Sequence, residues 1–489
     1  MKRTLAVLLT LAMLFSCLSF ASAEGTTETI QVAYMLTMNA AEQRQMVQDA
    51  VNQLLAKKGL GVQVEFVCID FASWATQINL MLTDGSVDLF NACFMPTISV
   101  LADNGSIAPM DDLFNQYGQG ILQTLGDYID CAKVGGVLYG APKMNAFSSA
   151  LMFVMNKDIC DEVGIDPTTI TDFDTLTAAL QKVHAAKPDL TMIANGKLGA
   201  YMDTINADSL GTQYPLGCLL LGEDGTSLKV QNYYASDTFK NLLGYVKQWA
   251  GNGFFMKDPM NAQDGSMAYI SNGQAFGGFV SYSDEATAVS VQQKAIGKDI
   301  YAAQITAAPW ATTNNINGMT WCVPSLSTHK EAAVKFLNEL FTDPELSNLV
   351  CNGIEGVHYV VTDQGNITYP EGLDAASTGW PSGMGTFWPN ICITYPWSPD
   401  PADIYQNWLA SNDTCSKSPA LGFTFDSSDV ADEVSSCATV VDKYVPALLL
   451  NIGDTDALYQ SFLNELEASG INDIITAKQA QLDTWAASK

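Results

Sequence analysis

The tryptophans are the residues whose placement points most clearly to a binding chemistry. Six of the nine lie between Trp310 and Trp408, several in Gly- and Pro-rich sequence such as Phe387-Trp388-Pro389. A tryptophan in a loop either fills a small core or faces a ligand. Its ring face suits the C–H face of a sugar, while Asp, Asn and Gln side chains hydrogen-bond sugar hydroxyls. The cluster therefore favours a neutral polyhydroxylated ligand, with loop packing as the alternative for any single ring.

No catalytic or metal-binding motif accompanies these rings. The three histidines, His184, His329 and His358, have no metal-ligand spacing, and the chain has no P-loop, dinucleotide fingerprint or G-x-S-x-G elbow. The Asp454-x-Asp456 pair resembles the start of a calcium loop but lacks its Gly and its terminal Glu, so an acidic helix start is favoured. We therefore expect no catalytic residue, metal or cofactor. A glycosidase that uses two of the 52 acidic residues stays an alternative, because such a pair has no fixed spacing.

The charge balance narrows the ligand class further. The 489 residues carry 23 Lys+Arg against 52 Asp+Glu, a formal charge of −29. Nucleic acid and anionic membrane surfaces require a basic face, so both are poor partners. The only arginines are Arg3 and Arg44, and arginine is the residue that best recognises carboxylates and phosphates. An anionic ligand is therefore disfavoured.

The first 23 residues have the pattern of an export signal. Lys2 and Arg3 precede an apolar run over residues 5–15, and Ala21-Ser22-Ala23 gives a small-residue cleavage pattern. Leu14-Phe15-Ser16-Cys17 is an approximate lipobox in which Phe15 fits poorly, so lipidation at Cys17 stays open. We expect an exported protein that is extracellular or held at the cell surface by a lipid.

Ten cysteines follow the predicted signal peptide, and their state is open at this stage. The even number and the oxidising export route permit disulfides, but no C-x-x-C pair occurs and several cysteines sit in apolar runs, such as Cys68 and Cys93. Buried free thiols are an equal alternative.

The hydrophobic pattern predicts an α/β lobe at the N-terminus. Strands are expected at residues 31–36, 62–69 and 89–94, with helices at 40–58 and 71–83 between them. This alternation indicates βαβ units and a mainly parallel sheet. Beyond it we expect helices at 174–184, 236–250 and 331–341, a loop-rich stretch at 363–412, and a helical end at 427–489 with breaks at Gly453 and Gly470.

Several motifs in this order resemble one known family. They are WATQINLMLTDGSVDLF (residues 74–90), MDDLFNQYG (110–118), GGVLYGAPKMNAFSSALMFVMNKDI (135–159), CNGIEGVHYVV (351–361), SPALGFTFD (418–426) and QAQLDTWAA (479–487). Together they resemble the carbohydrate-type (family 1) extracellular solute-binding proteins of bacterial ABC importers. The likeness is to the long, lipoprotein-like branch that has an extra C-terminal domain, and it spans nearly the whole chain after the export signal.

This resemblance implies a periplasmic-binding-protein-like fold of two α/β lobes joined by hinge strands, with a helix-rich C-terminal extension. Projected onto this chain, lobe one is expected at residues 27–144 plus 279–318. Lobe two is expected at 145–278 plus 319–489, with the extension at about 363–489. Ligands in such sheets lie at the carboxyl ends of the strands, which predicts a cleft at the crossings.

The expected ligand contacts lie near predicted strand ends or in Trp-rich loops. They are Asn39, Trp74, Phe94, Asn145, Tyr282, Asp284, Trp321, Trp388 and Trp397. Replacing Trp321 with Ala is expected to weaken sugar binding without unfolding the protein.

The resemblance implies capture of a solute and no chemistry on it. The expected ligand is a neutral sugar or oligosaccharide, the expected partner is an ABC permease in the membrane, and the expected state is a monomer. Two alternatives stay open: an exported glycoside hydrolase, and a sugar sensor or adhesin of the same fold.

Overall fold

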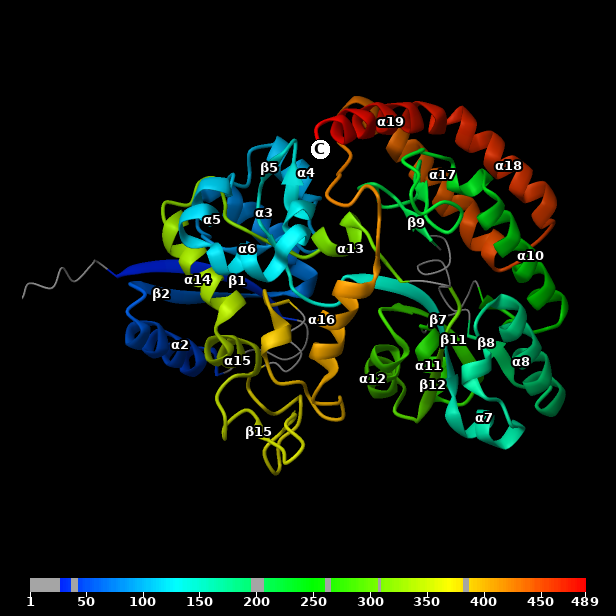
Figure 1. The fold of residues 1–489 in the computed structure, drawn as a ribbon. Helices are drawn as coiled ribbons and strands as arrows, with labels where there is room; N and C mark the ends of the chain where they lie inside the picture. Colours follow the sequence, from blue (N-terminus) through cyan, green and yellow to red (C-terminus); the bar gives the residue numbers. More distant parts are fainter. Residues whose placement is uncertain (1–26, 37–42, 195–205, 260–264, 307–308, 381–386) are drawn as a thin grey trace, which may run out of the picture.

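The computed structural model describes residues 27–36, 43–194, 206–259, 265–306, 309–380 and 387–489. In these segments the chain forms two lobes that lie side by side, with the C-terminal helices packed along the second lobe (Figure 1). No helix among the described residues is long and apolar enough to cross a membrane.

The first lobe is built on parallel strands joined by helices. Strand β1 (Glu28–Leu36) pairs in parallel with β2 (Val62–Asp70), from Glu28 opposite Val62 to Leu36 opposite Asp70. Helix α2 (Arg44–Lys58) connects them and ends at Gly59. This residue has a φ of 68°, a left-handed conformation that glycine adopts freely. The predicted βαβ order is confirmed.

The third strand of this lobe is shorter than predicted. Helix α3 (Trp74–Asp84) is followed by Leu89, which bridges to Val32 in parallel, and then by the two-residue strand β3 (Phe90–Asn91). β3 continues into a small antiparallel sheet of order β3-β14-β6, with β14 at Thr320–Cys322 and β6 at Ala141–Pro142. Segments far apart in sequence therefore meet at the base of the first lobe.

The second lobe is built on a mixed sheet of order β17-β13-β7-β11-β8. Its centre is β7 (Ser148–Asn156), which is buried along almost its whole length and pairs with β11 (Ala275–Tyr282) antiparallel. The other strands are β8 (Thr191–Ile193), β12 (Ile300–Gln304), β13 (Trp310–Ala311) and β17 (Ser416–Lys417), with β12 paired to β7 off the main path. Helices α8 (Phe173–Ala186) and α10 (Asp237–Gly251) place their buried residues in the same core as this sheet.

The last part of the expected C-terminal extension (about 363–489) is a set of three helices, α17 (Ala431–Leu449), α18 (Thr455–Ala468) and α19 (Ile471–Ala487). The predicted breaks at Gly453 and Gly470 are confirmed, since each glycine lies between two of these helices with a positive φ. The three helices share the hydrophobic core of the second lobe, so they are an integral part of it.

Shorter elements complete the two lobes and the hinge. The helices are α4 (Ile98–Asp103), α5 (Asp111–Tyr117), α6 (Gln119–Leu125), α7 (Lys157–Val163), α11 (Ser266–Ser271), α12 (Glu285–Ile296), α13 (Thr313–Asn317), α14 (Lys330–Thr342), α15 (Pro344–Asn352) and α16 (Ile404–Thr414). The strands are β4 (Lys133–Val134), β5 (Val137–Leu138), β9 (Ala207–Asp208), β10 (Leu219–Leu220), β15 (Val360–Val361) and β16 (Ile367–Thr368).

The hydrophobic cores divide the chain differently from the expected lobe boundaries. Residues 279–305, expected in lobe one, pack in the second lobe, because β11 pairs with β7 along its length. Residues 320–351, expected in lobe two, pack in the first lobe, because β14 pairs with β3 and α14 packs on α5 and α6. The crossing between these lobes therefore falls at about residues 306–319 rather than at 278 and 318.

The cysteines are free thiols. All ten from Cys68 to Cys437 are unpaired, and eight of them are buried. Burial raises the pKa of several of these thiols, for example that of Cys93 to about 12, because the thiolate is poorly solvated there. The sequence left open whether these cysteines form disulfides or are buried free thiols, and the structure shows free thiols, most of them buried.

Candidate functional site

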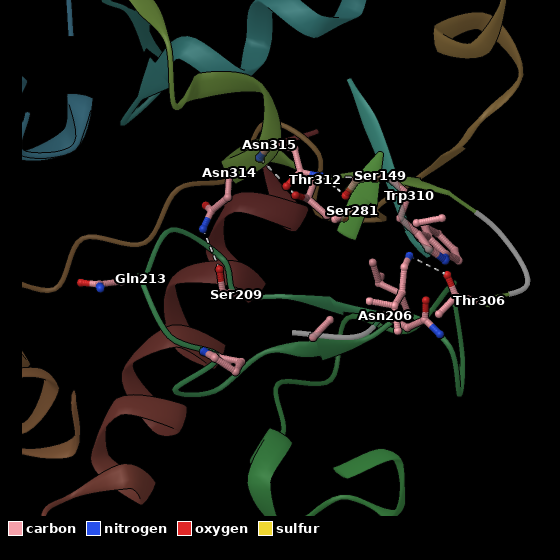
Figure 2. Close-up of a pocket in the computed structure, with 15 residues that line it drawn as sticks. Ser149, Asn206, Ser209, Gln213, Ser281, Thr306, Trp310, Thr312, Asn314 and Asn315 are labelled. Carbon is pink, nitrogen blue, oxygen red and sulfur yellow. Dashed lines mark hydrogen bonds between the residues drawn. The ribbon is translucent and has the colours of Figure 1, made fainter. Parts of the chain in front are cut away.

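A pocket of about 220 Å³ lies where the second-lobe sheet meets the segment that crosses between the lobes, which includes α13 (Thr313–Asn317) and is called the hinge below. It is formed at the first residues of β7, the last residues of β11 and the segment around α13 (Figure 2). The polar residues that line it are Ser149, Asn206, Ser209, Gln213, Ser281, Thr306, Thr312, Asn314 and Asn315. Ala150, Leu151, Ala207, Pro215, Leu221 and Trp310 complete the lining.

The short helix α13 supplies two amide side chains to the pocket. Thr312 caps this helix by accepting a hydrogen bond from the backbone N–H of Asn315, at 3.3 Å. Asn314 Nδ2 donates to Ser209 Oγ at 2.6 Å, and Asn315 Nδ2 donates to Ser149 Oγ at 3.2 Å. One helical turn in the hinge thus joins the start of β7 to the loop before β10 (Figure 2).

Trp310 is the aromatic residue among the described residues that line this pocket. It is half-buried on β13, where its backbone pairs with Ser149 of β7 and Ser416 of β17. The indole ring lies tightly against Gly225: a Cβ at that position would come within 2.4 Å of the ring atom Cη2. The glycine therefore leaves the space that the ring needs to lie in the pocket wall.

The lining of the pocket carries no ionisable side chain among the described residues. Its polar groups are five hydroxyls and four amides, which both donate and accept hydrogen bonds. Such groups match the hydroxyls of a neutral ligand, and Trp310 can stack on an apolar ring face. Glycoside hydrolysis needs two carboxyl groups at the scissile bond, and none occurs among the lining residues that the structure describes.

The first lobe presents exposed aromatic rings at the carboxyl ends of its strands. Phe71, directly after β2, is 53 % exposed, and Phe94, shortly after β3, is 60 % exposed. Their rings meet edge to face with centroids 5.2 Å apart, and Phe387 lies 6.4 Å from Phe94. Phe94 also has a φ of 54°, an uncommon conformation for a residue with a large side chain. Of the predicted contacts, Phe94 is thus placed at the surface.

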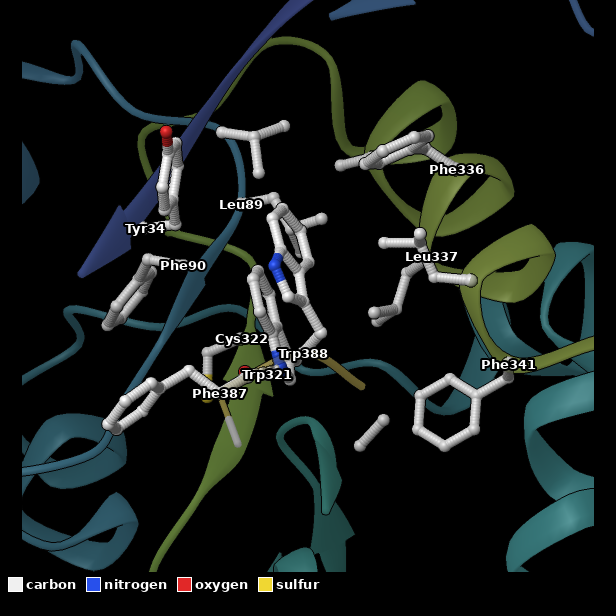
Figure 3. Packing of buried hydrophobic residues seen from close by; sticks show 14 of the residues in the cluster. Tyr34, Leu89, Phe90, Trp321, Cys322, Phe336, Leu337, Phe341, Phe387 and Trp388 are labelled. Carbon is white, nitrogen blue, oxygen red and sulfur yellow. Dashed lines mark hydrogen bonds between the residues drawn. The ribbon is translucent and has the colours of Figure 1, made fainter. Parts of the chain in front are cut away.

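Three of the predicted contacts are core residues. Trp74, Trp321 and Trp388 are each 1 % exposed. Trp321 and Trp388 stack on each other with ring centroids 5.4 Å apart, among Tyr34, Leu89 and Phe336 (Figure 3). A ligand cannot reach these rings without unpacking the first lobe, so the structure reassigns them from the ligand to the core.

The burial of Trp321 also revises the expected effect of its removal. Truncating a buried Trp to Ala costs about 3–5 kcal/mol of stability, so unfolding is the expected consequence. The ring also helps to fix the backbone at Phe387, because Trp321 Nε1 and Asn91 Nδ2 both donate to the carbonyl of Phe387, at 3.0 and 2.9 Å.

The remaining predicted contacts have packing partners of their own. Asp284 caps α12 by accepting from the Thr287 N–H at 2.8 Å, and Tyr282 accepts from Gln292 Nε2 at 2.6 Å. Trp397 Nε1 donates to Asn352 Oδ1 at 2.9 Å, and the Asn145 carbonyl accepts from Asn412 Nδ2 at 2.7 Å. Asn39 and Cys17 lie outside the described residues.

Sequence reasoning missed most of the pocket. Trp310 lies in the tryptophan cluster but is not among the predicted contacts, although the polar run Thr312-Thr313-Asn314-Asn315 directly after it is a usable signal. Asn206, Ser209 and Gln213 lie in a loop whose approach to the hinge depends on long-range packing, so no local pattern could have indicated them.

No metal centre accompanies the pocket in the part of the chain that the structure describes. Across those residues, no group of three or more His, Cys, Asp or Glu side chains is placed to hold an ion.

Comparison with known families accounts for both parts of the chain. Residues 40–345 match the model of the bacterial extracellular solute-binding protein family, and residues 419–487 match a domain of unknown function, DUF3502. The first match covers more than half of the chain, and this protein belongs to the bacterial extracellular solute-binding protein family. Members of this class capture a solute and do not convert it.

Individual relatives agree with this assignment. A carbohydrate ABC transporter substrate-binding protein of Streptococcus pneumoniae serotype 4 is 22 % identical over 449 residues, which are 90 % of this chain and 87 % of that protein. The crystal structure of an N-glycan transport solute binding protein from Streptococcus pneumoniae has a TM-score of 0.81 at 21 % identity, covering 94 % of this chain and 98 % of the other.

A more distant structure shares the same fold. An HMO-binding, ABC-transporter-associated solute binding protein from Bifidobacterium longum infantis has a TM-score of 0.61 at 14 % identity, over 94 % of this chain and 99 % of the other. The expected periplasmic-binding-protein-like fold is confirmed by these structures.

Proposed function

We propose that this protein is the substrate-binding component of a carbohydrate ABC importer and captures a neutral oligosaccharide between its two lobes. The observation that carries the ligand class is the pocket at the hinge, whose described lining residues supply hydroxyl, amide and indole groups but no charged side chain. A uronic acid or phosphate would enter it without a counter-charge, at a desolvation cost of several kcal/mol.

The relatives support the same ligand class. The similar proteins include one named for N-glycan transport and one named for HMO binding. An alginate-binding protein also shares the fold, at a TM-score of 0.59 and 13 % identity. Alginate is a polyuronate, so fold alone does not select the charge of the ligand. The lack of charge among the described lining residues is what favours a neutral ligand here.

The exposed rings of the first lobe would supply the second wall of the site. Phe71 and Phe94 lie at the carboxyl ends of β2 and β3, the position at which ligands bind in open α/β sheets. A sugar held between these rings and Trp310 would contact both lobes. Contact with both lobes favours the closed form, because only that form makes both sets of interactions.

The wider setting follows from the family. We propose that a membrane permease recognises the closed, loaded form, that the protein acts as a monomer, and that residues 1–23 direct its export, with Cys17 as the site of a lipid anchor if cleavage precedes it. The ligand class does not depend on the anchor.

A tryptophan substitution tests the proposed site. Trp310→Ala is expected to lower the affinity for a neutral oligosaccharide more than tenfold, because it removes the only aromatic ring among the residues that line the described pocket. The measurement is the ligand-induced shift of the thermal midpoint, which reports affinity through mass action. Trp397→Ala is the matched control, since that half-buried indole donates to Asn352 and packs on Tyr369. Equal loss in both variants would reject Trp310 as a contact.

A further inference from the structure

A buried lysine of the C-terminal helices reaches the loop that forms one wall of the pocket. Lys478 lies on α19, and its side chain is fully buried. Its Nζ donates to the carbonyl of Ser209 at 2.8 Å, to Thr212 Oγ1 at 2.7 Å and to the carbonyl of Gly217 at 2.7 Å. An ammonium group has three protons, and all three are used on this one loop.

The same loop is held from the opposite side by the hinge. Asn314 of α13 donates both to Ser209 Oγ at 2.6 Å and to the carbonyl of Thr212 at 3.2 Å. The loop, residues 206–217, therefore lies between Lys478 and Asn314, and its residues Asn206, Ser209 and Gln213 face the pocket. Figure 2 shows α19 behind this loop and α13 above it.

The backbone of the loop adopts conformations that need outside support. Asn206 has a φ of 51° and Leu210 a φ of 59°, and a left-handed residue other than glycine costs on the order of 1–3 kcal/mol unless its surroundings hold it. Contacts from the C-terminal region stabilise these conformations, since the Phe425 N–H donates to the Leu210 carbonyl at 2.9 Å. Tyr214 OH donates to Asp442 of α17 as well.

Two buried ionisable groups, Asp208 and Cys218, lie near enough to the amine of Lys478 to influence its charge. Asp208 of β9 is 1 % exposed and accepts from Ser418 Oγ at 2.5 Å and from the Leu210 N–H at 2.9 Å. Burial lowers the pKa of Lys478 to about 7, against the opposing influence of Cys218 and Asp208. Burial likewise raises the pKa of Asp208. A neutral amine keeps two protons for three acceptors, so deprotonation leaves one contact of the loop without a donor.

We propose that Lys478 is a positioning residue for the ligand pocket: through its amine, the C-terminal helices hold the 206–217 loop in the conformation that binds the sugar. The role of the C-terminal domain of unknown function is then to build one wall of the binding site. This inference rests on the proposed function, because it concerns the affinity of the same pocket.

The proposal is tested by measuring the affinity of the protein for a neutral oligosaccharide as a function of pH. The protein used is the chain that follows the predicted signal peptide. Lys478→Met keeps the chain length and removes the charge and the donors. We expect it to lower the affinity for a neutral oligosaccharide at pH 6 at least tenfold. The wild-type affinity is expected to fall severalfold from pH 6 to 8.5, and this pH dependence is expected to vanish in Lys478→Met. Lys443→Met is the matched control, since Lys443 lies on the neighbouring helix α17, is 56 % exposed and pairs with Glu465.

Two further measurements keep the result clear if Lys478→Met folds poorly. Thr212→Val leaves the lysine in place and removes one of its three acceptors, so a smaller, severalfold loss of affinity is expected. Amide hydrogen exchange without ligand, compared at a single pH, is expected to be faster over residues 206–217 in both variants than in the wild type and in Lys443→Met.

The outcomes separate this inference from the function on which it rests. If the wild type binds the sugar while both variants keep its affinity, its pH profile and its exchange rates, the positioning role is overturned and the proposed function stands. If the wild type binds no neutral oligosaccharide at any pH, the proposed function is overturned and this inference falls with it.

Discussion

At the scale of single residues, the pocket depends on space as much as on contacts. Trp310 can lie in the wall only because residue 225 has no Cβ, since the nearest ring atoms would be 2.4 and 3.0 Å from one. Distances below about 3 Å between carbon atoms are strongly repulsive, because the optimal separation is about 3.5–4.0 Å. The glycine therefore belongs to the site although it makes no polar contact with a ligand.

Gly225→Ala is accordingly expected to lower the affinity for an oligosaccharide about fivefold to tenfold while the fold is retained. The substitution displaces the indole ring, and Gly225 does not have the left-handed φ that would oppose alanine. Calorimetric titration of both single variants and the double variant forms a cycle. In a Trp310→Ala background the second change should have no further effect. Additive losses would show that Gly225 acts independently of the ring.

Residue identity alone could not separate ligand-facing rings from core rings. Trp310 and Trp321 lie eleven positions apart in one Trp-rich stretch, yet Trp310 is half-buried at the pocket and Trp321 is 1 % exposed under Trp388. Burial of either ring away from water is favourable, whether the ring is covered by the core or by a ligand. The sequence pattern is therefore the same for a core ring and a ligand-facing ring. The difference arises from segments far away in the chain that cover one ring and leave the other accessible.

At the scale of elements, the sequence predicted correctly those features that depend on residues close together in the chain. The helix breaks at Gly453 and Gly470 and the parallel β1–α2–β2 unit are confirmed, because glycine conformations and hydrophobic periodicity act within a few residues. The lobe boundaries were predicted less well. The expected boundary between residues 278 and 279 falls inside β11, but pairing with β7 keeps the whole strand in the second lobe. Only tertiary structure specifies that pairing.

Asp284 shows how an element can account for a residue that was expected to bind ligand. Its carboxylate accepts from the N–H of Thr287 at 2.8 Å and from the hydroxyl of the same residue at 2.9 Å at the start of α12. Asp284→Ala is expected to lower the free energy of unfolding by about 0.5–2 kcal/mol through loss of this cap. Chemical denaturation measures that change.

The matched control at this position is Asp284→Asn, which keeps a capping oxygen and removes the charge. It should retain most of the stability, and both variants should bind oligosaccharide as the wild type does. A large loss of affinity in Asp284→Asn would return this residue to the binding site.

At the scale of the whole molecule, buried ionisable groups set the pH range of stability. Burial lowers the pKa of Lys478 to about 7 and that of Lys143 to about 8, against an ordinary value of 10.5. Between these values the unfolded chain binds more protons than the folded one, so stability rises with pH. Burial raises the pKa of thiols such as Cys93 and Cys392 to about 12 from 9.0. Above pH 9 the unfolded thiols ionise first, and stability falls.

The thermal midpoint is therefore expected to rise from pH 6 to a maximum near pH 8–9 and to decline above it. Scanning calorimetry across this range, with reductant present throughout, measures the profile. Lys478→Met should flatten the rising part, since it removes one of the two lysines responsible. A midpoint that falls steadily from pH 6 to 9 in the wild type would contradict the burial of neutral amines.

The two lobes and the C-terminal helices act together in the proposed function. The pocket takes its strands from the second lobe, its amides from the hinge helix α13 and the support for its loop from α19, more than 260 residues along the chain from Ser209. The residues that build the pocket are far apart in the sequence. For this reason the resemblance to a family could indicate the fold, but only the structure could show which residues form the site.

The central claim is that this protein binds a neutral oligosaccharide in an uncharged pocket. Its most direct test is a calorimetric titration of the purified protein with a neutral oligosaccharide and with an oligouronate of the same length, under identical conditions. We expect saturable one-site binding of the neutral sugar, no heat of binding from the uronate, and no hydrolysis of the sugar on prolonged incubation. Binding of the uronate alone would contradict the account, because the described residues of the pocket offer no cation to receive its carboxylates.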